Sequence, residues 1–135
     1  MEFVEKFQAG DSFKKRGGFH LIMGDNDQAI SDFTKSIDLK PDGEIYRYRG
    51  YTFVKKGEFS QAIEDYGEAI RLAPDDATNF YMRAAAQRNA GELNKALSDC
   101  EEALQLSPDN GRLLLIARRQ NGLAKTRPVN EPRGS

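Results

Sequence analysis

The chain has 135 residues, of which 30% are charged, and its 20 Lys and Arg nearly balance 21 Asp and Glu. The mean hydropathy is −0.69 and no run of about 18 apolar residues occurs, which excludes an apolar membrane-spanning helix. A net charge of −1 is not that of a protein that binds nucleic acid through its overall charge. One Cys and one His exclude a disulfide framework and a Cys/His zinc site, so we expect no metal or cofactor. The unpaired Cys fits a reducing compartment, and the first ten residues lack a secretory signal, so we expect a cytoplasmic location.

Residues 1–9 are predicted to be an N-terminal extension. Phe3 and Phe7 lie one helical turn apart, which fits either a short helix that covers the next segment or a frayed end.

Three similar segments follow, at residues 10–42, 43–76 and 77–110. In each, 24 steps separate a small residue from a proline: Gly17 from Pro41, Gly50 from Pro74 and Ala84 from Pro108. Self-similarity at a fixed period is typical of arrays in which each unit packs on its neighbours.

Each segment has the pattern of two helices joined by a glycine turn. The second segment carries apolar residues three and four steps apart along one helix, namely Phe59, Ala62, Ile63, Tyr66, Ala69 and Ile70. We expect Gly24, Gly57 and Gly91 to make the turn inside each unit. The acidic residues after each proline are expected to cap the next helix, namely Asp42, Asp75, Asp76 and Asp109. Small residues such as Gly17, Gly50 and Ala84 predict close helix approach.

The order small residue, Gly, aromatic, Ala, aromatic, Ala, Pro resembles the tetratricopeptide repeat. In the second segment the residues are Gly50, Gly57, Phe59, Ala62, Tyr66, Ala69 and Pro74. The resemblance covers about residues 10–124 and implies an all-α fold, a right-handed superhelical solenoid of antiparallel helix pairs. It also implies a protein–protein interaction module, a scaffold or adaptor, and not an enzyme.

Residues 111–124 begin a fourth unit and stop, and we interpret them as a capping helix for the last apolar face. Four consecutive apolar residues, 113–116, point all round such a helix. Two interpretations stay open: a buried cap, or a contact that joins two copies of the chain into a homo-oligomer. Residues 125–135 are polar with two prolines, and we expect a disordered tail.

Charge is distributed unevenly between the two helices of the units. The first helices with their turns, residues 10–24, 43–57 and 77–91, sum to +7, whereas residues 25–42, 58–76 and 92–110 sum to −12. The resemblance implies that first helices line a concave groove and second helices form the convex back. The groove is therefore predicted to be basic and to bind an acidic peptide or one with apolar and acidic residues. The residues expected to line it are Lys14, Lys15, Arg47, Tyr48, Tyr51, Lys55, Tyr81, Met82, Arg88, Arg112 and Arg119.

One branch of the resembled family holds the acidic C-termini of Hsp70 and Hsp90 with five clamp residues, Lys, Asn, Asn, Lys and Arg. The corresponding positions here carry Lys14, Gly18, Tyr48, Thr78 and Met82. Since only Lys14 matches, the sequence does not predict a chaperone adaptor of that type.

Catalytic and nucleic-acid functions are weaker interpretations. His20 and Cys100 lie in different units and on different kinds of helix, so they cannot form a nucleophile–base pair, and Cys100 falls on an apolar stripe. Single-stranded RNA could stack on the tyrosines of the groove, but an acidic pI of about 5.9 disfavours nucleic acid as a partner. Self-assembly without any peptide is a third function that stays open.

Overall fold

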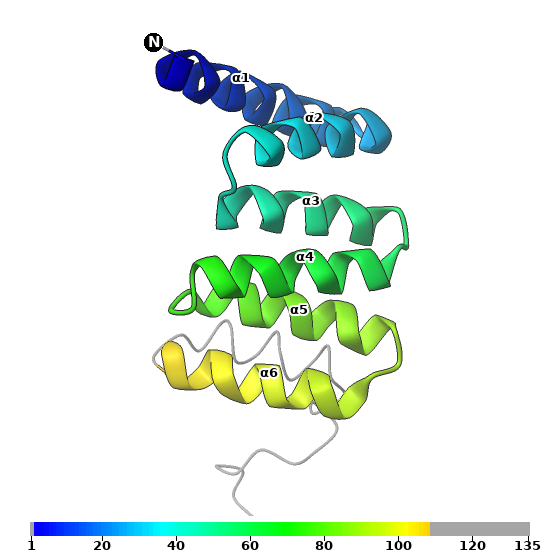
Figure 1. Cartoon of the computed structure of the whole chain (residues 1–135). Coiled ribbons are helices and arrows are strands. Elements are labelled where there is room, and N and C mark those ends of the chain that lie inside the picture. Colours follow the sequence, from blue (N-terminus) through cyan, green and yellow to red (C-terminus); the bar gives the residue numbers. More distant parts are fainter. Residues whose placement is uncertain (1, 109–135) are drawn as a thin grey trace, which may run out of the picture.

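The computed structural model describes residues 2–108, and within them the chain is entirely helical. The six helices are α1 (Glu2–Met23), α2 (Asn26–Leu39), α3 (Gly43–Lys55), α4 (Phe59–Leu72), α5 (Ala77–Asn89) and α6 (Leu93–Leu106). Successive helices run back and forth and stack into an array of three hairpins, α1–α2, α3–α4 and α5–α6 (Figure 1). The predicted all-α solenoid of antiparallel helix pairs is confirmed.

The predicted turns and two of the predicted caps, Asp42 and Asp76, are confirmed, whereas Asp75 precedes the residue that caps α5. The turn glycines Gly24, Gly57 and Gly91 have φ of +84°, +80° and +85°, a region that side chains disfavour. Asp42 accepts a 2.8 Å hydrogen bond from the Glu44 N–H at the start of α3, and Asp76 accepts a 3.0 Å bond from the Thr78 N–H at the start of α5. These carboxylates satisfy amide groups that have no partner within the helix.

The boundary predicted between residues 9 and 10 has no counterpart in the backbone. Helix α1 runs unbroken from Glu2 to Met23 because residues 2–9 contain neither Pro nor Gly, and Gly10 continues the helix. Gly10 is buried against α2, where Ser36 donates a 2.8 Å hydrogen bond to the Gly10 carbonyl oxygen. The first hairpin therefore has a longer first helix than the others.

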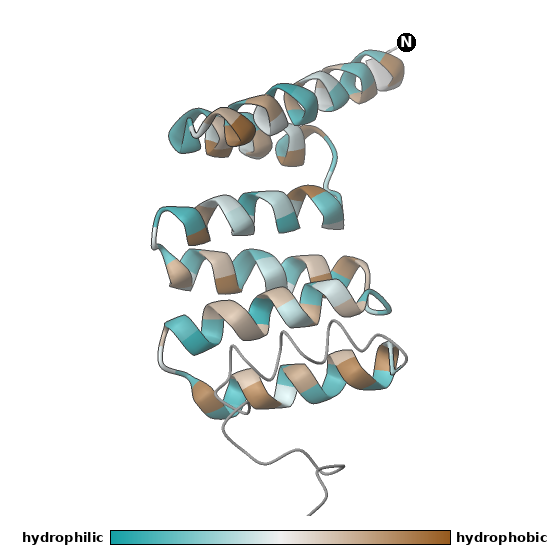
Figure 2. Ribbon diagram, turned by 180° about the vertical axis from the view of Figure 1, so that it is seen from behind, coloured by the Kyte–Doolittle hydropathy of each residue, from teal (hydrophilic) through white to brown (hydrophobic). Residues whose placement is uncertain are grey.

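The core is a row of small clusters rather than one large centre. Phe33 in the first hairpin and Tyr66 in the second are buried, and each lies directly beneath a glycine of the facing helix. A Cβ on Gly17 would lie 2.8 Å from the Phe33 ring, and one on Gly50 would lie 2.9 Å from the Tyr66 ring. The third hairpin replaces this combination with Ala84 over Cys100, so that Ala takes the place of the glycine and the smaller Cys takes the place of the aromatic ring. Apolar and polar stretches alternate along the helices (Figure 2).

Several predictions made from the sequence lie outside the described residues. They are the capping helix at 111–124, the tail at 125–135, the cap at Asp109, and the groove positions Arg112 and Arg119. Among residues 2–108, no helix combines the length and apolar character that crossing a membrane requires.

Candidate functional site

The first helices of the three hairpins, α1, α3 and α5, are neighbours along one side of the array, which we call the first-helix face. A cavity of about 260 Å³ opens between α3 and α5 on this face, and we call it the α3/α5 cavity. The structure brings four of the predicted groove residues together around it: Tyr51, Tyr81, Met82 and Arg88. The other residues that line it are Val54, Tyr66, Ala85 and Asn89.

Two cations at the α3/α5 cavity are available to a ligand. The Arg88 side chain is exposed and donates only a 3.3 Å hydrogen bond to the neighbouring Asn89 side chain. The Lys55 ammonium lies 5.7 Å from the centre of the Tyr51 ring, beside the cavity. Neither cation has a carboxylate partner within residues 2–108, and no residue that lines the cavity is acidic. This end of the first-helix face therefore carries uncompensated positive charge.

Other predicted groove cations are already paired. Arg47 donates a 2.9 Å hydrogen bond to Asp76 and a 3.1 Å bond to Asn79, which ties α3 to the start of α5. The Lys14 ammonium lies 2.6 Å from the Glu44 carboxylate and joins α1 to α3. Hydrogen bonding from Lys14 lowers the pKa of the Glu44 carboxyl, and the same bond raises the pKa of Lys14.

The remaining predicted positions in the described range are Lys15 and Tyr48. Lys15 is strongly exposed and lies 3.1 Å from Asp11, one turn earlier on α1. Tyr48 packs its ring against Phe33, with 5.9 Å between ring centres, so it belongs partly to the core of the first hairpin. Desolvation by burial raises the pKa of the Tyr48 hydroxyl.

A second cavity, of about 210 Å³, lies between α1, α2 and α3. Its walls mix Lys14 and Lys40 with Asp11 and Asp42, so they have no net charge. The Lys40 ammonium also lies 4.5 Å from the centre of the Phe7 ring. The two cavities thus differ in electrostatic character.

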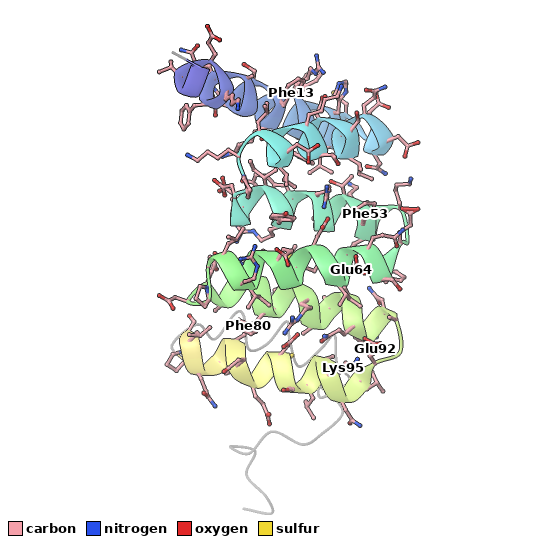
Figure 3. The ribbon with its side chains drawn as sticks, in the orientation of Figure 1. Phe13, Phe53, Glu64, Phe80, Glu92 and Lys95 are labelled. Carbon is pink, nitrogen blue, oxygen red and sulfur yellow. The ribbon has the colours of Figure 1, made fainter. Side chains whose placement is uncertain are left out.

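The structure corrects the predicted charge distribution. One arginine of each first helix points at the second helix of its own hairpin, where it makes two hydrogen bonds of 2.6–2.9 Å to one aspartate. The guanidinium also lies 5.4–5.9 Å from the centre of an aromatic ring three residues earlier. Phe13 and Phe80, labelled in Figure 3, are two of these rings. The three units are Phe13–Arg16–Asp32, Tyr46–Arg49–Asp65 and Phe80–Arg83–Asp99.

These arginines each neutralise one aspartate of a second helix and contribute little to the first-helix face. The +7 sum therefore overstates the charge that a ligand meets, because a charge sum counts residues without regard to where their side chains point. The signal was present in the sequence, since the aromatic, the Arg and the Asp recur at the repeat period with the Arg and Asp always 16 residues apart.

His20 and Cys100 lie in different hairpins and have different surroundings. The His20 ring nitrogens lie 3.6 Å from Asp25 and 3.7 Å from Asp32. Cys100 is buried, as predicted, in a cluster with Ala84 and Ala96. Among the described residues, no group of three His, Cys, Asp or Glu side chains could hold a metal ion.

Models of one protein family match most of the helical array. The model described as TPR repeat matches residues 50–91, and two models described as Tetratricopeptide repeat match residues 15–42 and 77–110. The chain belongs to the tetratricopeptide repeat family. Domains of this family are generally protein-interaction modules rather than enzymes.

Solved structures of tetratricopeptide repeat (TPR) domains are similar to this chain. The second TPR of Spaghetti (RPAP3) bound to the HSP90 peptide SRMEEVD is 27% identical with a TM-score of 0.73, and the match covers 79% of this chain and 100% of that one. The first TPR domain of human RPAP3 is 25% identical with a TM-score of 0.78, covering 86% and 93%. The Arabidopsis OM64 TPR domain, at 21% identity and a TM-score of 0.80, covers 88% and 98% and supports the fold alone. A comparison with curated protein sequences gives no match.

Proposed function

We propose that this TPR protein is an interaction module, a scaffold or adaptor, that binds an acidic or mixed acidic and apolar peptide across α3 and α5. The observation that carries the proposal is the α3/α5 cavity, where Tyr51, Met82 and Arg88 converge with no acidic side chain among the lining residues. Tyrosine and arginine are enriched among residues that dominate binding energy, and methionine is enriched at interfaces.

Magnitudes decide what each group contributes. An exposed ion pair contributes about 0.2–1 kcal/mol, whereas a micromolar complex requires about 8 kcal/mol. Arg88 and Lys55 therefore steer and orient an acidic segment, and affinity comes from burial of Tyr51 and Met82. Tyr51 is 41% exposed in the free protein, so its ring has apolar surface to bury.

The solved complex of the second Spaghetti TPR with an HSP90 peptide supports peptide binding as the mode of interaction. The residues at the five clamp positions do not support binding of an Hsp70 or Hsp90 C-terminus. Only Lys14 matches that clamp, and here it already pairs with Glu44. We therefore propose recognition of an acidic segment through the α3/α5 cavity rather than through a clamp for a C-terminal carboxylate.

The test uses a library of N-acetylated, C-amidated nonapeptides, with binding measured by fluorescence anisotropy. The variant Tyr51→Ala is expected to weaken the tightest peptides by at least about 30-fold, since truncating a binding hot spot costs about 2 kcal/mol or more. Arg88→Glu is expected to weaken acidic peptides by about tenfold and to reduce their salt dependence.

The matched controls lie on second helices. Leu72→Ala truncates an apolar residue of similar exposure on α4, and Lys95→Glu reverses an exposed charge on α6, labelled in Figure 3. Both controls should bind as the wild type does. Equal losses in the controls and the α3/α5 variants would reject the proposed site.

A further inference from the structure

Tyr66 differs from the other residues that line the α3/α5 cavity. It comes from α4, whereas the others come from α3 and α5. Its side chain is only 1% exposed and its ring passes beneath Gly50, 2.9 Å from where a Cβ would lie. Tyr66 thus packs in the core and also lines the cavity. The hydroxyl at the end of its ring is the polar group that it can present to a ligand in the cavity.

The Tyr66 hydroxyl has no hydrogen-bond partner within residues 2–108. It is not among the fully buried side-chain atoms that lack a partner within residues 2–108, so it faces the α3/α5 cavity, where a ligand can accept its hydrogen bond. Desolvation by burial raises the pKa of Tyr66 well above its ordinary value, so the hydroxyl stays protonated and is a donor at every physiological pH.

The repeat itself shows that packing does not require this hydroxyl. Phe33 occupies the equivalent place in the first hairpin, beneath Gly17 and fully buried. A similar ring packs there without an oxygen atom, so packing beneath the glycine does not require the hydroxyl of Tyr66.

The charged groups around this hydroxyl favour an anionic acceptor. Arg88, which has no carboxylate partner within residues 2–108, lines the same cavity, whereas Arg47 nearby is already paired with Asp76. Asp65, the carboxylate next to Tyr66 in sequence, is already held by two 2.8 Å hydrogen bonds from Arg49. Val54, Met82 and Ala85 supply apolar walls that suit a methylene stem. At about 260 Å³ the cavity is smaller than the ~300–1,000 Å³ of small-molecule sites, which favours a single side chain.

We propose that the α3/α5 cavity receives a glutamate side chain of the bound peptide and that the Tyr66 hydroxyl donates a hydrogen bond to its carboxylate. This inference rests on the proposed peptide binding and assigns its specificity to one donor in the wall of the cavity. The Arg88 guanidinium then pairs with the glutamate carboxylate at the rim of the cavity, and the methylenes of the glutamate contact the apolar walls. Loss of a hydrogen bond to a charged group corresponds to about a 10- to 100-fold loss in affinity.

The test compares the wild type with Tyr66→Phe on nonapeptides whose fifth residue is Glu, Gln, Met or Leu, with N-acetyl and C-amide ends. The matched control is Tyr46→Phe, which also removes a tyrosine hydroxyl, at a place where the other repeats carry Phe13 and Phe80. The wild type and Tyr46→Phe should favour Glu over Met and Leu by about tenfold or more. Tyr66→Phe should lose that preference and bind the Met and Leu peptides as the wild type does.

The outcomes separate the two proposals. An unchanged preference for Glu in Tyr66→Phe, or a wild-type preference for Met or Leu, overturns the role of Tyr66 while peptide binding stands. Equal affinity for Gln and Glu also overturns the proposal, because it shows recognition of a neutral acceptor. Absence of binding to every peptide by the wild type rejects the proposed function and this inference with it.

A second measurement needs no ligand. Because the hydroxyl is unpaired in the free protein, Tyr66→Phe should leave Tm unchanged or raise it. A fall of about 4–8 °C, the size expected for one lost internal hydrogen bond, would overturn the inference by showing that the hydroxyl has a partner inside the protein.

Discussion

Gly50 lies against the Tyr66 ring, so the effect of Gly50→Ala on stability should depend on that ring. We expect the substitution to destabilise the wild type and to stabilise a variant that lacks the ring. A Cβ at Gly50 would lie 2.9 Å and 3.0 Å from two carbons of the Tyr66 ring and 3.2 Å from the Asp65 Cβ. Carbon atoms in contact are usually about 3.5–4.0 Å apart, and the fully buried ring has no space to move into. We expect Gly50→Ala to lower the free energy of unfolding by about 1–3 kcal/mol.

Replacing Tyr66 by Cys recreates the combination of the third hairpin, where Ala84 lies over Cys100. Tyr66→Cys alone should destabilise the protein by about 3–5 kcal/mol, as for other large-to-small changes of buried aromatics. In that background Gly50→Ala meets no ring, and only the 3.2 Å contact with the Asp65 Cβ remains. Its effect should therefore turn from a cost to a gain of up to about 0.5–1 kcal/mol, the helix-propensity gain of Ala over Gly.

The assay is urea unfolding followed by circular dichroism for the two single variants, the double variant and the wild type, with m-values compared to check two-state behaviour. Gly18→Ala is the matched control, since it lies within α1 and a Cβ there would have no neighbour within 4 Å. It should stabilise by about 0.5–1 kcal/mol. A neutral or stabilising Gly50→Ala in the wild type, or the same cost in both backgrounds, would refute the reasoning.

The remaining predictions concern ion pairs and a turn. Asp99→Ala leaves the half-buried Arg83 without its partner and should cost about 1–3 kcal/mol in urea unfolding, whereas the exposed Glu101→Ala should stay within about 0.5 kcal/mol. Hydrogen bonding from Arg16 lowers the folded-state pKa of Asp32, so its stabilisation is present above the unfolded pKa near ~3.9 and is lost as pH falls through the folded pKa. Tm should therefore fall less steeply in Asp32→Asn than in the wild type as the pH is lowered below about 4, and parallel curves would contradict this. Gly57→Ala puts a side chain at φ +80° and should cost about 1–2 kcal/mol, opposite in sign to Gly18→Ala.

Local features were the predictable part of the fold. Turn glycines, caps and apolar spacing act within a few residues, and three copies of the same pattern reinforce one another. Gly57 and Asp76 therefore take the roles that the sequence predicts for them. Resemblance to the repeat indicates where a unit begins but not how far its first helix extends beyond it, and here α1 begins at Glu2.

The charges of the site depend on contacts between helices, which the sequence pattern does not specify. Arg16 and Lys15 are adjacent in the chain, yet one reaches Asp32 on α2 and the other pairs along α1 with Asp11. Glu44 lies on α3, yet its carboxylate cancels the charge of Lys14 on α1.

Tyr66 was assigned to the apolar stripe, which is correct, but its place in the cavity depends on geometry that spacing does not reveal. The ring reaches the first-helix face because Gly50 has no side chain and because α5 lies beyond α3. Comparing Tyr66 with Phe33 in the aligned repeats would have drawn attention to the extra hydroxyl.

The most direct test of the account is an NMR titration of the ¹⁵N-labelled protein with the tightest acidic peptide from the nonapeptide library. We predict that the largest amide shift changes occur in α3 and α5, around Tyr51, Met82 and Arg88, and that they are lost in Arg88→Glu. Shift changes confined to α2, α4 and α6, or unaltered in Arg88→Glu, would contradict binding on the first-helix face.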